Sequence, residues 1–290
     1  VDKYLAQPGA KDEVVETIQT ATDETLYFFT NRGNCFMLDV TRIPETMKLK
    51  DRGSLLTGLI AGLADHEHAV ALVCVKSDEM AKKGDFLFIT KNGQVKRTAA
   101  AEYGIRRARF AAINLKGDDE LVGMVQVDPE DKDDIILITK LGMALRFKLD
   151  TVSCTGRATA GVRGIDVGKD DEVRWFEIPK AGDMLFVLSD RGFGKRMLSD
   201  DVERQGRAGK GQKLLPMNKT GETGTRAAVC LNVTGAKSVR VEQKHGHTVL
   251  LNMDEIAVER RASKGQLLVN VLLDDVVQYG ALTAETKDEK

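Results

Sequence analysis

Residues Ile135–Lys148 read IILITKLGMALRFK. A run of aliphatic residues ends at Thr139, a short turn contains Gly142, and a second apolar run carries Arg146 and Lys148. A glycine in a two- or three-residue turn supplies the positive φ that a tight hairpin requires. The stretch therefore predicts a β-hairpin whose second strand bears basic residues.

The same unit recurs along the chain, with turn glycines spaced 60, 49, 50 and 54 residues apart. They are Gly33, Gly93, Gly142, Gly192 and Gly246. After each turn come a basic residue, usually a glycine, another apolar strand, an acidic loop and a closing strand. Four short strands in a period of about 50 residues are typical of a propeller blade. No long stretch of 3.6-residue periodicity separates the strands, which argues against a parallel α/β fold.

We therefore predict an all-β fold, a propeller-like disc of five to six four-stranded blades forming one domain, residues 1–283. Residues 1–24 include Glu13–Ile18, which resembles the closing strand of a unit, and are predicted to be the remnant of a first blade. Because the chain begins with Val1, we expect it to be part of a longer protein and to start inside a sixth blade. Residues 284–290 are predicted to be a polar tail. The repeats are predicted near residues 25–84, 85–133, 134–182, 183–235 and 236–283.

The composition is that of a soluble globular protein. The 290 residues include 43 Lys+Arg and 44 Asp+Glu, for a net charge of −1, and 42% are hydrophobic. No apolar run approaches the roughly 18–20 residues of a spanning helix, and no secretion signal opens the chain. The cysteines are Cys35, Cys74, Cys154 and Cys230, none in a CxxC pair. We expect a reduced, cytoplasmic protein in which Cys74 and Cys230 occupy buried strand positions.

Charge is distributed unevenly along the repeats. Acidic residues cluster in loops such as 128–134 and 169–172, whereas basic residues cluster between the second and third strands of each unit. If equivalent loops lie on one rim, the basic residues form a ring that can follow a bent phosphate backbone without reading bases. The alternative is that these residues are simply solvated turn tips. The candidate DNA-contacting residues are Arg52, Arg106, Arg107, Arg109, Arg163, Arg196, Arg204, Arg207, Lys210, Lys213, Arg261 and Lys264.

No stretch predicts a catalytic, metal or cofactor site. Residues Arg204–Lys213 superficially resemble a phosphate-binding P-loop, but Gly211 stands where Ser or Thr is needed for Mg²⁺, and no helix is expected to follow. The pairs His66–His68 and His245–His247 lack a convincing third ligand, so we predict surface histidines rather than zinc ligands. There is no nucleophile elbow and no distinctive carboxylate pair.

Five stretches taken together and in this order resemble one known family. They are LYFFTNRG at Leu26–Gly33, ITKNGQVKR at Ile89–Arg97, AINLKGDDELV at Ala112–Val122, AGVRGI at Ala160–Ile165 and RGFGKR at Arg191–Arg196. They are similar to the C-terminal domain of the A subunit of bacterial type IIA topoisomerases, that is, DNA gyrase or topoisomerase IV. The resemblance implies a β-pinwheel, in which neighbouring blades exchange strands, with a basic perimeter that bends or wraps DNA.

The resemblance also implies a non-catalytic domain of an ATP-dependent topoisomerase that presents DNA to the cleavage gate. The implied partners are double-stranded DNA of any sequence, an N-terminal breakage-reunion domain and the ATPase B subunit, with no membrane. ATP and Mg²⁺ are expected only in the full enzyme, and the implied location is the bacterial cytoplasm, with the nucleoid. The family's catalytic tyrosine belongs to another domain, so Tyr4, Tyr27, Tyr103 and Tyr279 are not assigned that role; Tyr27 lies in a predicted core strand. From the residues alone, the rival is a protein-interaction propeller that does not bind DNA.

One motif departs from the gyrase pattern. Gyrase members carry a Gln-Arg-Arg-Gly-Gly-Lys-Gly box in the first blade, and that box is not present here. Residues Tyr4–Lys11 are a candidate remnant of it, and Arg204–Gly211 resemble it in a later blade. Residues Lys50–Gly53 are nearer to the topoisomerase IV pattern. The sequence leans toward topoisomerase IV, or a gyrase paralogue without the box, and leaves relaxation, decatenation and supercoiling open.

Overall fold

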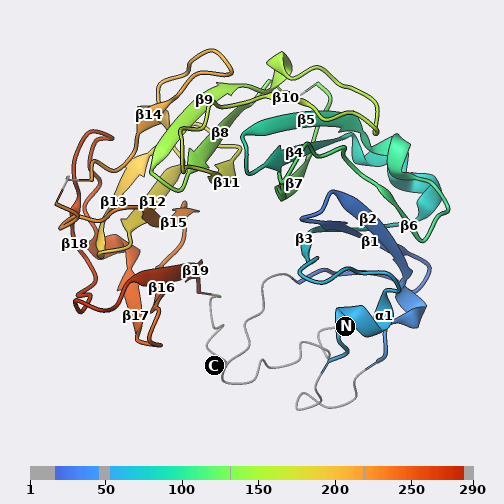
Figure 1. The fold of residues 1–290 in the computed structure, drawn as a ribbon, viewed down its shortest axis with the longest axis horizontal. Helices are drawn as coiled ribbons and strands as arrows, with labels where there is room; N and C mark the ends of the chain where they lie inside the picture. Colours follow the sequence, from blue (N-terminus) through green and yellow to red (C-terminus); the bar gives the residue numbers. More distant parts are fainter. Residues whose placement is uncertain (1–16, 46–52, 131, 218–219, 284–290) are drawn as a thin grey trace. The chain divides into compact units, whose positions relative to one another are not determined.

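The computed structural model describes residues 17–45, 53–130, 132–217 and 220–283 (Figure 1). These residues are almost entirely β-structure and turns, with one four-residue helix, α1 (Leu56–Leu59). In this part of the chain no helix is long and apolar enough to cross a membrane. Most of the predicted first-blade remnant, and the predicted tail, lie outside the described residues. Short 3-10 helices are η1 (Val40–Arg42), η2 (Ser77–Lys83), η3 (Ala100–Tyr103), η4 (Leu149–Thr151), η5 (Ser199–Asp201) and η6 (Met253–Glu255).

Each repeat begins with an antiparallel hairpin and ends with a strand that pairs with the first strand of that hairpin. The hairpins are β1–β2 (Thr25–Thr30, Asn34–Asp39), β4–β5 (Asp85–Thr90, Gln94–Ala99), β8–β9 (Asp134–Thr139, Met143–Lys148), β12–β13 (Met184–Ser189, Phe193–Leu198) and β16–β17 (Ser238–Gln243, Thr248–Asn252). The closing strands are β3 (Ala69–Val75), β7 (Leu121–Val127), β11 (Val173–Glu177), β15 (Ala227–Asn232) and β19 (Val277–Leu282).

The hairpin turns explain why β1, β4, β8 and β12 end in Thr or Ser, whereas β16 ends in Gln243. At the β8–β9 turn, Gly142 has φ +78° and donates its N–H to the carbonyl oxygen of Thr139 at 2.9 Å. The Thr139 hydroxyl accepts the N–H of Met143 at 3.1 Å. Ser189 plays the same part at the β12–β13 turn, where its hydroxyl accepts the N–H of Phe193 at 3.2 Å. A hydroxyl at the strand end therefore satisfies a turn donor that would otherwise lack a partner.

A fourth strand joins each of the first four hairpins, and it comes from the following repeat (Figure 1). The sheet orders are β3-β1-β2-β6, β10-β5-β4-β7, β11-β8-β9-β14, β15-β12-β13-β18 and β17-β16-β19. The exchanged strands are β6 (Arg109–Ala111), β10 (Val162–Arg163), β14 (Gln212–Lys213) and β18 (Gln266–Leu267). The predicted all-β, strand-exchanging architecture is confirmed, with four four-stranded sheets and one three-stranded sheet in the described residues.

Two glycines let exchanged strands approach their neighbours. Gly211 and Gly265 precede β14 and β18 with φ of +77° and +74°. A Cβ atom on Gly211 would lie 2.3 Å from the carbonyl oxygen of Ala144, and one on Gly265 would lie 2.4 Å from that of Gly194. Both the backbone conformation and the lack of space therefore require glycine.

The described chain divides into two compact units. Among the described residues, unit 1 comprises residues 17–45, 53–90, 95–130 and 153–162, and unit 2 comprises residues 91–94, 132–152, 163–217 and 220–283. The prediction of one continuous domain stays a prediction.

The core of unit 1 is aromatic. The rings of Phe29, Phe86 and Phe88 lie 5.4–5.7 Å, centroid to centroid, from one another or from Tyr103, in edge-on or tilted arrangements. Such pairs add to the stability gained by burying the rings. Tyr27 is fully buried in β1, which confirms its place in a core strand.

Unit 2 is built on aliphatic clusters. One gathers Ile136, Leu185 and Val187 from the first strands of two hairpins, and another gathers Val239 and Val241 from β16 with residues of neighbouring strands. All six residues of β8 are buried, as expected of a strand covered on both faces.

The four cysteines are free thiols. Cys230 is buried in β15 as predicted, whereas Cys74 is only half-buried, so that prediction was wrong for Cys74. The physical reason is alternation: buried and half-buried positions alternate along the second half of β3, and Cys74 takes a half-buried one.

Candidate nucleic-acid interface

A basic loop precedes each exchanged strand in the later repeats. We name them the third-repeat loop (153–161), the fourth-repeat loop (203–211) and the fifth-repeat loop (257–265). Each loop begins beside the second hairpin strand of the preceding repeat, through an N–H that donates to a strand carbonyl at 2.8 Å. These bonds run from Thr155 to Arg97, from Gln205 to Arg146 and from Glu259 to Arg196. Each loop is therefore attached to a sheet at its start.

One arginine in each loop clips the exchanged strand of the preceding repeat. Arg157 donates from Nη1 to the carbonyl oxygen of Ala111 at 2.6 Å. Arg207 makes the equivalent bond to Arg163 at 2.5 Å. Arg261 makes it to Lys213 at 3.0 Å. These three arginines are half-buried, so part of each guanidinium is engaged by the fold itself.

Four other cations of the fourth and fifth repeats stay available. Lys210, Lys213, Arg260 and Lys264 are exposed, and their side chains make no hydrogen bond or ion pair with another described residue. A cation without a carboxylate partner can exchange its counterions for a phosphate without first breaking a salt bridge. These four are the strongest phosphate-binding candidates in unit 2.

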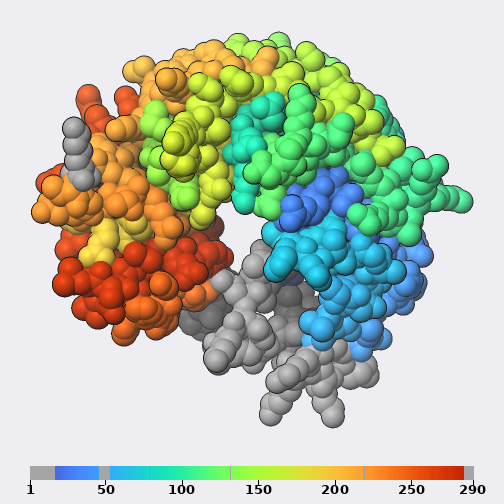
Figure 2. All heavy atoms as spheres, viewed as in Figure 1, coloured from blue at the N-terminus to red at the C-terminus, as the bar shows by residue number. Residues whose placement is uncertain are grey.

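The bonds made by Arg207 and Arg261 place two basic loops against the exchanged strands that precede them. Because Arg207 bonds the main chain of Arg163, the fourth-repeat loop lies against β10; because Arg261 bonds that of Lys213, the fifth-repeat loop lies against β14. Figure 2 shows the atoms of the fourth and fifth repeats, coloured orange to red, adjacent on the surface. The basic residues of these two loops and of the strands beside them are called the basic track: Arg163, Arg207, Lys210, Lys213, Arg260, Arg261 and Lys264.

Two predicted contact residues in unit 2 are held by acceptors within the fold. Arg204 donates from Nε and Nη2 to Asp134 Oδ2 at 3.0 and 2.9 Å, and the Asp134 side chain is only 3% exposed. Arg146 donates from Nε to the same oxygen at 2.7 Å. Arg196 donates from Nε to the carbonyl oxygen of Ile256 at 2.7 Å. DNA contact by Arg204 or Arg196 therefore competes with bonds that already stabilise the loops.

In unit 1 the predicted residues divide similarly. Arg106 and Arg107 are exposed and free of side-chain bonds to described residues. Arg109, in β6, lies over the Phe36 ring at 5.2 Å from its centroid and donates to the carbonyl oxygen of Gly62 at 3.2 Å. Arg52 lies outside the described residues. DNA contact by all of these side chains stays a prediction.

Sequence reasoning missed two buried lysines beneath the loops. Lys96 donates to the carbonyl oxygens of Ala112 and Arg157, and Lys195 donates to those of three residues in the fifth-repeat loop. Burial lowers the pKa of each ammonium to about 8. The lysines looked like surface charge because sequence shows the type of a side chain but not its acceptors. The available signal was their place in the repeat, where the β8–β9 hairpin has Leu145.

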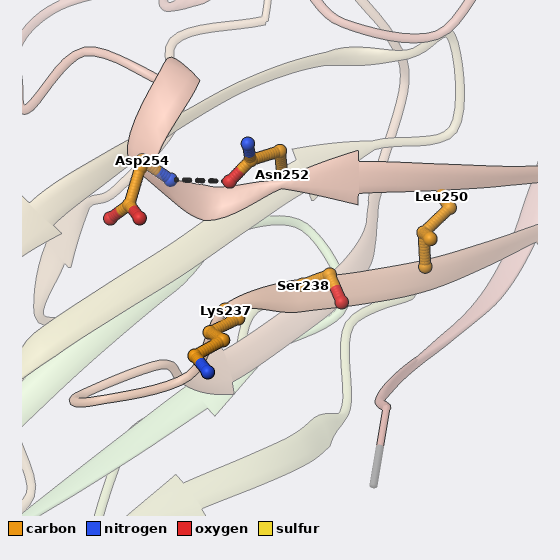
Figure 3. Close-up of a pocket in the computed structure, with 5 residues that line it drawn as sticks. All are labelled: Lys237, Ser238, Leu250, Asn252 and Asp254. Atoms are coloured by element: carbon orange, nitrogen blue, oxygen red, sulfur yellow. Dashed lines mark hydrogen bonds between the residues drawn. The ribbon is translucent and has the colours of Figure 1, made fainter. Parts of the chain in front are cut away.

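The remaining candidates are the histidine pairs and the stretch that resembles a P-loop. In the described ranges no three His, Cys, Asp or Glu side chains cluster as metal ligands would. The fourth-repeat loop, which superficially resembled a P-loop, runs straight into strand β14. A shallow hollow lies on the last sheet, where the N–H of Asp254 donates to Asn252 Oδ1 at 3.1 Å (Figure 3). Lys237, Ser238 and Leu250 complete its lining.

Comparison with known proteins identifies relatives of the whole described fold. The family described as "DNA gyrase C-terminal domain, beta-propeller" matches residues 84–128, 133–180 and 183–225. The A subunit of DNA gyrase from Deinococcus deserti is 33% identical over 275 residues, which are 93% of this chain and 33% of that protein. The chain thus spans about a third of the length of the curated relatives it matches.

Solved structures agree with the sequence relatives. The C-terminal domain of a DNA topoisomerase IV superposes with a TM-score of 0.80 at 25% identity, over 90% of this chain and 79% of that one. A DNA gyrase A C-terminal domain superposes with a TM-score of 0.69 over 97% of this chain and 90% of that one; at 19% identity this match supports the fold alone. Together with the exchanged strands and the repeated hairpins, these matches show that the chain belongs to the β-pinwheel family of C-terminal domains found in the A subunits of bacterial DNA gyrase and topoisomerase IV.

Proposed function

We propose that this domain binds duplex DNA of any sequence and bends or wraps it along the basic loops, as a non-catalytic part of an ATP-dependent type IIA topoisomerase. The observation that carries the proposal is the basic track of unit 2, in which Lys210, Lys213, Arg260 and Lys264 have no partner among the described residues. Exposed cations without a carboxylate partner can bind phosphates, and they carry no base-specific information.

The clip arginines give the track a defined geometry. Each one joins a basic loop to the exchanged strand before it, so the main chain that carries the cations is held in place when the duplex arrives. Smoothly bending a 20–30 base-pair segment by 40–90° costs on the order of 1–6 kcal/mol, which added phosphate contacts can offset. A pre-ordered loop backbone reduces the entropy lost on binding, so more of the contact energy remains to bend the DNA.

The proposal extends to the whole enzyme through the names of the relatives. Partners would be an N-terminal breakage-reunion domain and the ATPase B subunit, which would use ATP and Mg²⁺, in the bacterial cytoplasm at the nucleoid. The domain itself would need no cofactor. Purified protein incubated with supercoiled plasmid, ATP and Mg²⁺ should give neither nicked nor linear DNA and release no phosphate. Cleavage or hydrolysis by the pure domain would overturn its accessory role.

Binding is tested by titrating the protein into two labelled duplexes of about 30 base pairs and unrelated sequence, with fluorescence anisotropy over a range of salt. We expect equal dissociation constants for the two duplexes and a slope of log K against log salt of about −0.9 for each phosphate contacted. A strong preference for one sequence would contradict phosphate-based recognition. No binding at low salt would overturn the proposal and favour the protein-interaction propeller.

A further inference from the structure

The ammonium of Lys195 is enclosed by the fifth-repeat loop. Lys195 lies in β13 and is fully buried, yet its Nζ donates to three carbonyl oxygens of that loop. The distances are 3.0 Å to Arg260, 2.6 Å to Arg261 and 2.5 Å to Ser263. An ammonium has three protons, so its entire donor capacity is used by this one loop.

The same three residues lie within the basic track, or next to it. Arg260 and Arg261 belong to the track, and Ser263 precedes Lys264. From outside, the loop is held by the Arg261 clip to Lys213. The charges around Lys195 are those of Glu259 and Arg261 from the loop and Asp201 from η5, so no single carboxylate pairs with the ammonium.

We infer that Lys195 is a positioning residue, whose buried ammonium holds the fifth-repeat loop in the conformation that presents Arg260, Arg261 and Lys264 to DNA. The inference rests on the proposed function for its second half. Hydrogen bonds that involve an ionised donor are stronger than neutral ones. Without the ammonium, three partly buried carbonyl groups would lose their donor, and the loop would have to rearrange for them to reach water.

The fourth-repeat loop is an internal control. At the position of Lys195, the preceding hairpin has Leu145, which is equally buried and donates nothing. The two loops nevertheless end in matching tryptic sites, Lys210-Gly211-Gln212 and Lys264-Gly265-Gln266. Proteolysis of a folded protein reports local opening when opening is fast relative to cleavage. The rate of cleavage after Lys210 therefore serves as the reference for the rate of cleavage after Lys264.

The variant is Lys195→Met, which keeps the length of the side chain and removes its donors. We expect cleavage after Lys264 to accelerate about tenfold or more while cleavage after Lys210 is unchanged, as for loss of roughly 1.4 kcal/mol of local stability. Met197→Ala, two residues along β13, is the matched control, because Met197 is buried and bonds no loop carbonyl. It should change both cleavage rates equally or not at all.

The DNA readout is the salt slope, because a loss of folded protein lowers affinity without changing the number of phosphates contacted. We expect Lys195→Met to weaken duplex binding about five- to tenfold and to reduce the slope by about one unit, as for one lost phosphate contact. If unmodified protein does not bind DNA, the proposed function fails, and the cleavage ratio alone decides whether Lys195 holds the loop.

Two results would overturn the inference. One is an unchanged ratio of cleavage after Lys264 to cleavage after Lys210 in Lys195→Met. The other is a faster cleavage after Lys264 with unchanged DNA affinity and slope, which would place the loop outside the DNA path. If Lys195→Met does not fold, Lys195→Leu, which introduces the residue that the β8–β9 hairpin has at this position, is measured in its place with the same two outcomes.

Discussion

The fourth- and fifth-repeat loops have similar sequences, but a different side chain lies beneath each of them. Residues Arg204–Lys213 read RQGRAGKGQK, and the equivalent residues Val258–Leu267 read VERRASKGQL. Both loops have the clip arginine, the exposed lysine and the glycine before the exchanged strand. Beneath the fifth-repeat loop lies the ammonium of Lys195, and beneath the fourth-repeat loop lies the side chain of Leu145.

The two loops also differ in backbone conformation and in the partner of one carbonyl group. In the fourth-repeat loop Ala208 adopts φ +68°, and the carbonyl oxygen of Gly209 accepts the N–H of Asp166 at 2.9 Å. In the fifth-repeat loop the corresponding carbonyl, that of Ser263, is bound by Lys195 instead. The N–H that would be its backbone partner is missing, because Pro216 stands where the previous repeat has Asp166. A lysine side chain thus replaces a backbone donor, and the exposed cations are kept.

The largest effect is expected where the two loops are alike. Gly211→Ala and Gly265→Ala should each lower the free energy of unfolding by about 2–4 kcal/mol, because φ is positive and a Cβ would meet a carbonyl oxygen. Denaturant unfolding measures both, with Gly206→Ala as the control, since nothing lies within 4 Å of its Cβ position. A loss below about 1 kcal/mol in either variant would show that strand exchange tolerates a side chain there.

Removing the arginine that bonds the exchanged strand should destabilise the two loops by different amounts. Arg207→Ala removes the clip of a loop without a buried lysine, and we expect a loss of about 2 kcal/mol. Arg261→Ala leaves Lys195 in place, and we expect about 1 kcal/mol. Urea unfolding, with hydrogen exchange of the loop amides, measures both. A larger loss of unfolding free energy for Arg261→Ala than for Arg207→Ala would mean that Lys195 does not help to hold the fifth-repeat loop.

The pH dependence of stability should reveal the buried lysines. Their folded-state pKa of about 8 lies below the unfolded value, so between these values the unfolded chain binds more protons. Stability therefore rises with pH in that window, by about 1 kcal/mol per lysine from pH 8 to pH 9. Urea unfolding of the unmodified chain should show this rise, and Lys195→Met should keep only the share due to Lys96. Equal rises in both proteins would exclude Lys195 as a group with a lowered pKa.

The smallest expected effects differ in sign between the loops. Ala208→Gly relieves a left-handed alanine and should stabilise the protein by about 0.5–1 kcal/mol. Ala262→Gly, at the equivalent position without positive φ, should destabilise it by a similar amount, because glycine loses more entropy on folding. Thermal unfolding of the two variants is sufficient. A change of stability with the same sign in both variants would show that Ala208 and Ala262 have the same backbone conformation.

Much of the fold could be predicted from sequence because its signals are local. The turn at Gly142 needs positive φ, the Thr139 hydroxyl caps it, and both recur at a period that spacing reveals. The exchange of strands could not be derived from pattern, because β10 and β14 have two residues each and show no periodicity. Only the family resemblance implied it.

The candidate site could be predicted only by charge type. Lys210 and Lys264 are predicted DNA contacts because they are basic and lie near glycine, and both are exposed in the structure. Arg204 was chosen for the same reason, but its guanidinium binds Asp134, which lies 70 residues away in sequence. Lys195 was not chosen at all, because a basic strand residue normally points to water. Partners distant in sequence decide which cations are available, and a single sequence does not show them.

The most direct test of the account is the salt dependence of duplex binding by two triple variants of equal charge. Lys210→Ala, Lys213→Ala and Lys264→Ala together remove track lysines, whereas Lys148→Ala, Lys169→Ala and Lys244→Ala together remove exposed lysines elsewhere in unit 2. We expect the first set to reduce the slope of log K against log salt by about two to three units and the second to leave it within about half a unit. Equal slopes for the two sets, with both proteins folded, would contradict a DNA path along the basic loops.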